Sequence, residues 1–170
     1  MINQNPIFVL RRLIKEELNL LDTQVLINSI TNDYLVSNAS NLFVVIYFER
    51  MQTISTENKS GEIANIFYEQ KQIWKQSTYN IEFMSKNLDA FDVVDTLPLV
   101  FISTKKRQLC EQYKIKIHDH LATDIMDISA VEGGSILKRF KTSVNVLHQY
   151  NNKKQVDYYD TFSTTTIFEK

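Results

Sequence analysis

Residues 127–150 read DISAVEGGSILKRFKTSVNVLHQY and contain the clearest alternation of apolar and polar side chains in the chain. From residue 140 onward, the apolar side chains of one parity are Phe140, Val144, Val146 and Tyr150. The side chains of the other parity are polar or charged, namely Arg139, Lys141, Ser143, Asn145 and Gln149. Because successive side chains of a strand point to opposite faces, this pattern predicts a half-buried β-strand. Gly133 and Gly134, two of only three glycines, predict a tight turn before it.

The bulk composition predicts one domain with few specialised sites. The chain has 170 residues, of which 44% are hydrophobic, which suffices for one core. Its formal net charge of −1 gives no overall attraction to nucleic acid or to an anionic membrane. Cys110 is the only cysteine, so an internal disulfide and a cysteine cluster for zinc are excluded. The N-terminal apolar run is too short for a signal or a membrane span, which predicts a soluble protein made in the cytoplasm.

Helices are predicted in three places. Asn5 and Pro6 are typical of a helix start, and apolar residues at three- and four-residue spacing extend the first helix from about Pro6 to Leu20. A second helix begins after Asn87, runs through Leu88, Phe91, Val94 and Leu97, and ends or kinks near Leu97 because Pro98 follows. The third helix covers Thr104–Tyr113, with Leu109 and Cys110 facing inward.

The remaining apolar patterns predict strands joined by polar loops. Leu42–Phe48 (LFVVIYF) is apolar throughout, which is typical of a strand covered on both faces, at the centre of the sheet or in a subunit interface. Ile73–Met84 alternates, and the polar loop Gln52–Gly61 joins the two strands in a long hairpin whose outer part projects. Shorter strands are expected within Asp22–Ile30 and after Tyr113, and a further loop at Asn32–Asn41.

The C-terminal region is expected to form a second hairpin. A turn at Asn151–Lys154 leads into a last strand, Val156–Phe162, that pairs back, and residues 163–170 form a C-terminal tail. The sequence thus predicts a single α+β domain over residues 1–162, in which a mainly antiparallel sheet with long β-hairpins packs against two to three helices.

Candidate chemistry is sparse. His118 and His120 would share one face of a strand, and His148 could complete three nitrogen ligands for zinc, although paired histidines at a strand end are more commonly hydrogen-bonded or solvated. Cys110 on an apolar helix face is typical of core packing rather than of a nucleophile. Two basic clusters could contact phosphates: Lys105, Lys106 and Arg107, and Lys138, Arg139 and Lys141. Asp124, Asp127 and Glu132 lie between the clusters in sequence and are the acids that could pair with them instead. No catalytic motif, cofactor or metal is predicted.

The order of features near the C-terminus resembles that of the tail-terminator (tail-completion) proteins of long-tailed bacteriophages. The matching positions are Ile128, Ser129, Glu132, Gly133, Gly134, Arg139 and Phe140, followed by Val156, Asp157, Tyr158, Tyr159 and Asp160. The resemblance implies a small α+β virion protein that caps the tail tube as a homohexameric ring, stops tube polymerisation and joins the tail to the head at the neck. Its implied partners are sister copies, the tail tube protein and the head connector, with DNA passing through the ring without sequence recognition and no membrane contact.

The resemblance also directs attention to interface residues. Arg139 matches a recurrent family feature and is expected to pair with an acid across the sheet or between subunits. Apolar side chains concentrated on the hairpins are expected at a subunit or tube interface, namely Ile66, Phe67, Tyr68, Trp74, Tyr158, Tyr159 and Phe162. Two alternatives remain: another neck component, such as a head-completion or connector protein, and a zinc-dependent enzyme that uses the three histidines.

Overall fold

The computed structural model describes residues 5–27, 42–63, 66–118, 124–132 and 135–155, without the side chains of residues 62, 63, 130–132 and 135–137. Three long strands dominate it: β2 (Phe43–Ile63), β3 (Ile66–Ser85) and β7 (Ser135–Gln155). The sheet order is β1-β2-β3-β7-β4, with β1 (Val25–Ile27) parallel to β2 and β4 (Ile115–Ile117) antiparallel to β7. Two short strands, β5 (Met126–Asp127) and β6 (Ala130–Glu132), also pair with β7.

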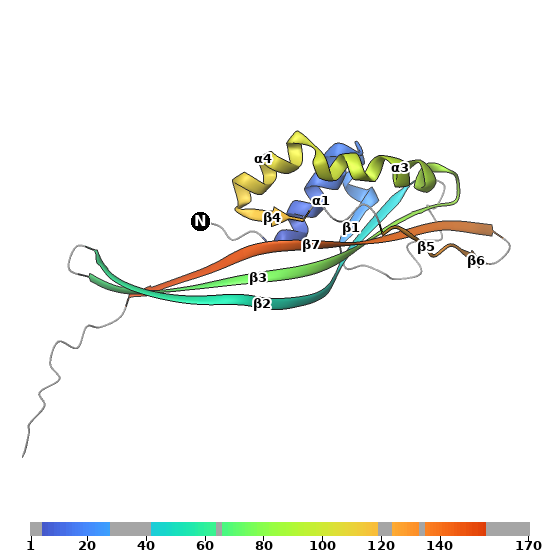
Figure 1. Ribbon diagram of the computed structural model, residues 1–170. Coiled ribbons are helices and arrows are strands. Elements are labelled where there is room, and N and C mark those ends of the chain that lie inside the picture. Colours follow the sequence, from blue (N-terminus) through green and yellow to red (C-terminus); the bar gives the residue numbers. More distant parts are fainter. Residues whose placement is uncertain (1–4, 28–41, 64–65, 119–123, 133–134, 156–170) are drawn as a thin grey trace, which may run out of the picture.

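Three helices lie together on one face of the sheet: α1 (Pro6–Glu17), α3 (Asp89–Ile102) and α4 (Thr104–Tyr113). They cover the half of the sheet in which β1 pairs with β2 and β4 pairs with β7. Figure 1 shows the other half of β2, β3 and β7 extending well beyond them. The core lies between the helices and the near face of the strands, where Leu10, Ile81, Phe83 and Val144 are almost inaccessible to solvent. These features confirm the predicted α+β class with long hairpins.

Local capping explains the helix boundaries. The side chain of Asn5 accepts a hydrogen bond from the Ile7 backbone N–H at 3.2 Å, and Ser103 caps α4 in the same way through the Lys106 N–H at 3.1 Å. The first helix ends at Glu17 rather than at Leu20, because Asn19 adopts a left-handed conformation with φ 50°. The start of α1 and both ends of α4 were predicted correctly.

Pro98 does not end α3, which corrects one of the two outcomes, an end or a kink, that the sequence predicted near Leu97. The helix continues to Ile102, and the residues after the proline include the buried Val100 and Phe101. A proline inside a helix costs about 3 kcal/mol. Burying a phenylalanine and a valine stabilises by about 1.5–3 kcal/mol each, which offsets that cost. On α3, Ala90, Val93 and Leu97 are buried, whereas Phe91, and Leu88 just before the helix, are exposed.

Two segments predicted to be irregular are regular strand. Gln52–Gly61, expected to be a loop, belongs to β2 and pairs with β3 throughout, apart from an irregularity at Ile54. Asn151–Lys154, expected to be a turn, belongs to β7 and pairs with Lys71, Gln72 and their neighbours on β3. Backbone hydrogen bonding does not depend on side-chain polarity, so polar sequences continue the ladder. A further correction concerns the centre of the sheet, which is β3 and not the Leu42–Phe48 strand.

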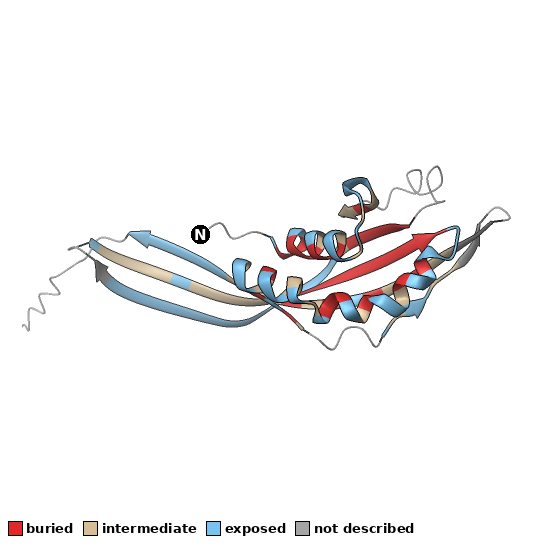
Figure 2. Ribbon diagram, turned by 90° about the horizontal axis from the view of Figure 1, so that it is seen from above, coloured by how far each residue is buried: buried red, intermediate tan, exposed pale blue. Residues whose placement is uncertain are grey.

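Burial divides the sheet into two parts. Figure 2 shows buried residues under the helices and mostly exposed or half-buried residues along the extension. On β2, Val44, Val45 and Ile46 are completely buried, as expected for a strand covered on both faces, but every residue from Met51 to Gly61 is exposed. Register shifts at Glu49 and Ile54 mark the transition, and such bulges bend and twist a strand.

Several predicted segments lie outside the described residues. They are the loop Asn32–Asn41, the Gly133–Gly134 turn, the last strand Val156–Phe162 and the tail 163–170. In the part of the chain that the structure describes, no helix is long and apolar enough to cross a membrane.

The division into a packed body and an exposed extension predicts that shortening a side chain lowers the free energy of unfolding more in the body than in the extension. Ile81→Ala, at a fully buried site on β3, should lower the free energy of unfolding by about 2–5 kcal/mol, because it removes buried surface and leaves a cavity. The matched variant Ile54→Ala, at a side chain that is 51% exposed, should change it by about 0.5 kcal/mol or less. Denaturant unfolding checks both values, and equal losses would contradict the division.

Candidate assembly surface: the ribbon and the groove at its base

The extension is a three-stranded antiparallel ribbon, defined here as Ser55–Ile63 of β2, Ile66–Trp74 of β3 and Gln149–Gln155 of β7. The three strands are level with one another. Ser55 and Gln149 are both opposite Trp74, and Gly61 and Gln155 are both opposite Tyr68. No described helix covers the ribbon (Figures 1 and 2). It is therefore a sheet without a hydrophobic core of its own.

The four candidate interface residues on β3 all lie on this ribbon. Ile66 is exposed, whereas Phe67, Tyr68 and Trp74 are half-buried. Tyr68 is covered by the ammonium group of Lys153, whose Nζ lies 4.0 Å from the ring centroid. That contact gives Tyr68 an internal partner that the sequence did not indicate. The other three candidates, Tyr158, Tyr159 and Phe162, lie outside the described residues.

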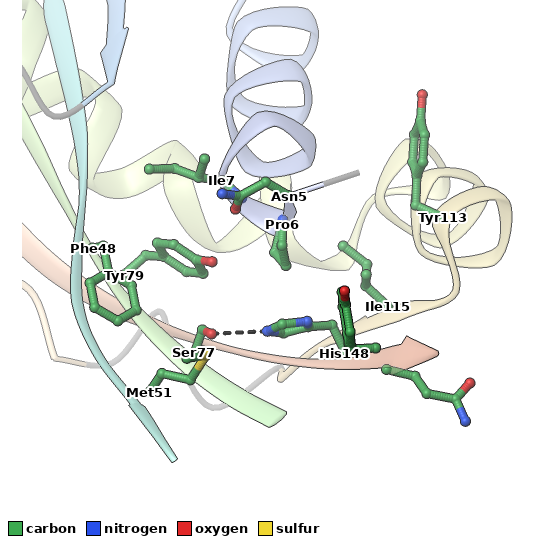
Figure 3. A pocket seen from close by; sticks show the side chains of 12 residues that line it. Asn5, Pro6, Ile7, Phe48, Met51, Ser77, Tyr79, Tyr113, Ile115 and His148 are labelled. Carbon is green, nitrogen blue, oxygen red and sulfur yellow. Dashed lines mark hydrogen bonds between the residues drawn. The ribbon is translucent and has the colours of Figure 1, made fainter. Parts of the chain in front are cut away.

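An open groove of about 500 Å³ lies where the ribbon leaves the body (Figure 3). Its walls are formed by the start of α1, the end of α4 and the strands β2, β3, β4 and β7, so its residues come from distant parts of the sequence. Three of its apolar side chains, Phe48, Met51 and Tyr150, are about half exposed. The lining consists of Asn5, Pro6, Ile7, Phe48, Met51, Ser77, Tyr79, Tyr113, Ile115, His148, Gln149 and Tyr150.

His148 lies in this groove as a hydrogen-bonded side chain. Its Nε2 is 3.0 Å from the Ser77 hydroxyl oxygen. Partial burial lowers the pKa of His148, and the positive charge of Lys75 lowers it further. The ring is thereby favoured in its neutral form.

The structure does not bring His118 to His148. Ile115 of β4 is paired with His148, whereas the His118 backbone N–H donates to the Asn145 carbonyl at 3.0 Å. Cross-strand partners share a face, and residues 145 and 148 of β7 differ in parity, so the two histidines lie toward opposite faces. His120 lies outside the described residues, which contain no group of three or more metal-ligating side chains. The described part of the chain therefore offers no support for the zinc hypothesis.

The face of the sheet away from the helices contains an ion pair that sequence reasoning anticipated for Arg139. Its Nη2 donates to Oε2 of Glu82 at 2.7 Å, across the β3–β7 pair. The Tyr47 hydroxyl donates to the other Glu82 oxygen at 2.6 Å. Burial raises the pKa of Tyr47, and the hydrogen bond to Glu82 raises it further, so the phenol remains a donor. Glu82 itself was missed, although a lone acid inside the buried strand NIEFM signals a charged partner.

Further polar pairs continue along the same face. Thr78 donates to the Asn145 side chain at 2.7 Å, and Ser143 donates to Asn80 at 2.7 Å. Both pairs join β3 to β7, and Thr78 and Asn80 are buried. Buried polar side chains that satisfy one another fix strand register, because a slip would leave them unpaired.

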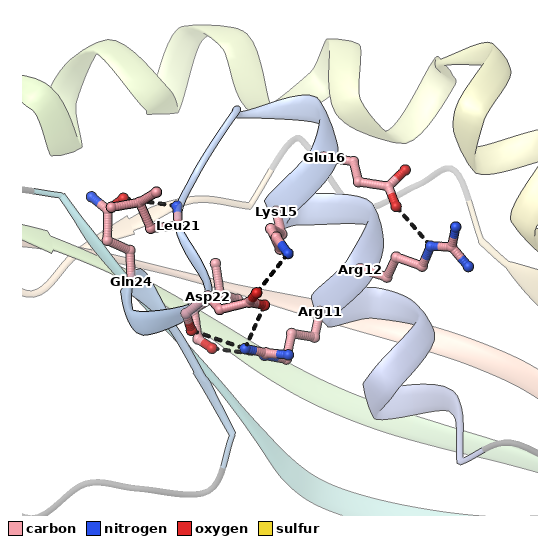
Figure 4. Close-up of polar contacts among 8 residues, drawn as sticks. Arg11, Arg12, Lys15, Glu16, Leu21, Asp22 and Gln24 are labelled. Atoms are coloured by element: carbon pink, nitrogen blue, oxygen red, sulfur yellow. Dashed lines mark hydrogen bonds and ion pairs between the residues drawn. The ribbon is translucent and has the colours of Figure 1, made fainter.

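Four basic residues of α1 and α4 form ion pairs within the body. Figure 4 shows Arg11 and Lys15 of α1 directed at Asp22, at 3.1 Å and 2.9 Å, and Arg12 paired with Glu16. Lys105 of α4 pairs with the same Glu16. Arg139 and Lys141 lie on the sheet face opposite to the helices, so they do not join Lys105 of α4 in one basic patch. The acids expected to pair with the two clusters were Asp124, Asp127 and Glu132, whereas Lys105 pairs with Glu16 and Arg139 pairs with Glu82.

Comparison with protein-family models and with curated protein sequences finds no match to this chain. The candidate site consequently depends on geometry: a bare ribbon, an apolar groove at its base, and a polar sheet face held together by cross-strand pairs.

Removing Arg139 tests the buried ion pair. Arg139→Met should destabilise the protein by about 3 kcal/mol, because it leaves the Glu82 carboxylate buried without a cation. Arg139→Met combined with Glu82→Gln should recover at least about half of that loss, since no uncompensated charge remains. Lys141→Met on the same face is the control and should cost about 0.5–1 kcal/mol, because its Nζ contacts only the Tyr47 ring at 5.6 Å. Additive losses in the double variant would contradict the ion pair.

The lowered pKa of His148 predicts a pH dependence of stability. Below the ordinary histidine value of 6.5, the unfolded chain binds a proton that the folded protein resists. The free energy of unfolding should therefore fall as the pH falls through this window, and level off below the folded-state pKa. His148→Gln should remove this component, whereas Ser77→Ala, which keeps the burial and Lys75, should retain it. Denaturant titrations from about pH 7.5 to about pH 5 check the slopes.

Proposed function

We propose that this chain is a structural virion protein that caps the end of a bacteriophage tail tube as a homohexameric ring. In this role it stops tube polymerisation and forms the surface to which the head is joined. The observation that carries the proposal is the ribbon. The resemblance of the C-terminal block to tail-terminator proteins supplies the ring order and the tube.

The energetics of the ribbon favour a protein that works by association. Ordering a residue costs about 1–2 kcal/mol of backbone entropy, which a domain recovers mainly by burying apolar surface. The ribbon buries little: along β2, all residues from Met51 to Gly61 are exposed. A partner that covers this surface would contribute the missing burial. A ring of sister copies provides such a partner at every position.

The groove at the base of the ribbon is consistent with the same role. Its exposed Phe48, Met51 and Tyr150 form an apolar patch rimmed by polar groups, which is typical of a protein interaction site. His148, the groove residue whose ordinary pKa lies near neutral pH, is held by Ser77 and has its pKa lowered. The tube protein, the head connector and a neighbouring copy are the proposed partners, and passing DNA would require no sequence recognition.

Tail morphology tests the proposal. Phage particles assembled without this protein should contain tubes of uncontrolled length, because nothing ends polymerisation, and electron microscopy measures the lengths. Complementation with the wild-type chain should restore one length. Tails of normal length in its absence would overturn the proposal. Normal tails that fail to attach to heads would instead favour a head-completion or connector role.

A further inference from the structure

We propose that neighbouring copies join edge to edge, with β7 of one ribbon adding in parallel to β2 of the next, so that the ribbons form one continuous sheet. The inference rests on the proposed self-assembly and names the contact that would build it. It concerns backbone pairing between ribbons, which the proposed function does not specify.

Both outer edges of the ribbon lack a described partner strand. On the β2 side, β1 pairs only with Val44, Val45 and Ile46, so from Met51 to Ile63 no described strand lies beyond β2. On the β7 side, β4 reaches only from Val146 to His148, and Gln149–Gln155 extends past it. Such edges present rows of backbone donors and acceptors, and soluble proteins normally protect them.

The two edges match in level and direction. Because β2 and β7 are each antiparallel to β3, they run the same way, and Ser55–Gly61 is level with Gln149–Gln155. A rotation about an axis along the ribbon preserves both level and direction. It would therefore bring β7 of one copy beside β2 of the next in parallel orientation. Unlike edges that meet head to tail do not close in a dimer; they generate a ring where the rotation closes and an open filament where it does not.

Charge favours this unlike pairing over the pairing of like edges. By sequence, Gln149–Gln155 carries two lysines and no acid, whereas Ser55–Ile63 carries two glutamates and one lysine. Two β7 edges placed together would bring Lys153 and Lys154 of both copies close to each other, which is destabilising. Beside β2 at the same level, Lys153 is diagonal to Glu57 and Lys154 is diagonal to Glu62, which offsets the direct approach of Lys153 to Lys59.

The helices determine which face such a cylinder encloses. They cover one face of the sheet, so only the other face can turn inward without steric conflict (Figure 1). On the ribbon, that face has the parity of Glu82 and Arg139 and includes Gln70, Gln72, Asn151 and Lys153 together with the aromatic Tyr68 and Trp74. The enclosed surface would therefore be mainly polar, with two aromatic rings from each copy, and Lys153 would cover one of them.

Engineered disulfides test the joint in the full-length chain with Cys110→Ser as background. Ser55→Cys and Gln149→Cys are separated within one copy by β3, that is by about 10 Å, which is too far for a disulfide. In the proposed joint, the same positions of adjacent copies lie about 5 Å apart. Oxidation should then convert most of the protein into covalent species larger than dimers, seen as a ladder in non-reducing electrophoresis. Two further pairs, Glu57→Cys with Gln149→Cys and Lys59→Cys with Gln149→Cys, would form the disulfide if the two edges are shifted along each other by two or four residues.

The controls make every outcome decisive. Ser55→Cys with Lys141→Cys, which places the second cysteine on the body, should not form a ladder. Dimers from either single cysteine variant of the ribbon would indicate twofold pairing of like edges and would overturn the inference. A chain that stays monomeric, or a ring measured by mass without a ladder in any of the three pairs, would also overturn it. A ring without a ladder leaves the proposed function standing, and a ladder together with normal tails in the absence of the protein overturns only the function.

Discussion

The structure depends on the backbone pairing of β3 with β2 on one side and with β7 on the other. This ladder is almost continuous from Ser85 to Tyr68, yet its surroundings change completely along its length. At one end, Ile81 and Phe83 are buried under the helices. At the other end, the same strands hold the ribbon together by main-chain hydrogen bonds and a few side-chain contacts. Each strand pair stabilises the next, so the packed body is what keeps the exposed ladder in register.

The sequence predicted the parts of the fold that are determined by burial. The alternation at Phe140, Val144 and Val146, the apolar run before Phe48 and the helix Thr104–Tyr113 all appear where expected, because a core selects apolar residues at the period of each element. The ribbon has no such selection. Gln52–Gly61 and Asn151–Lys154 are exposed strands, so their side chains carry no alternation, and their Asn, Ser, Gly and Lys content resembled that of loops. The end of α3 was missed for a related reason. The local effect of Pro98 favours an end or a kink near Leu97, whereas the burial of Phe101 favours continuing the helix.

The candidate site was foreseeable only in part. An acidic partner for Arg139 was expected, but which acid it is depends on the register. Arg139 pairs with Met84, and Glu82, two residues before Met84, lies on the same face of the sheet. The groove could not be foreseen, because α1, the end of α4 and the strands meet there only in three dimensions. The histidines illustrate the opposite error. His118 and His148 seemed able to converge, but the offset between Asn145 and His148 on β7 separates them.

The sequence of the ribbon bears on when it becomes ordered. Gly61 lies opposite Tyr68, and a Cβ at Gly61 would meet no atom within 4 Å, so space does not demand a glycine there. Glycine weakens a strand through backbone entropy, and the bulge at Ile54 interrupts the β2 ladder below it. Lys59 and Lys153 place positive charge near the tip of the ribbon, and charged side chains on edge strands oppose non-specific edge-to-edge aggregation. In the proposed assembly, a strand pair that is weak alone would gain backbone hydrogen bonds from a neighbour, so folding of the body and full ordering of the ribbon would be separable steps.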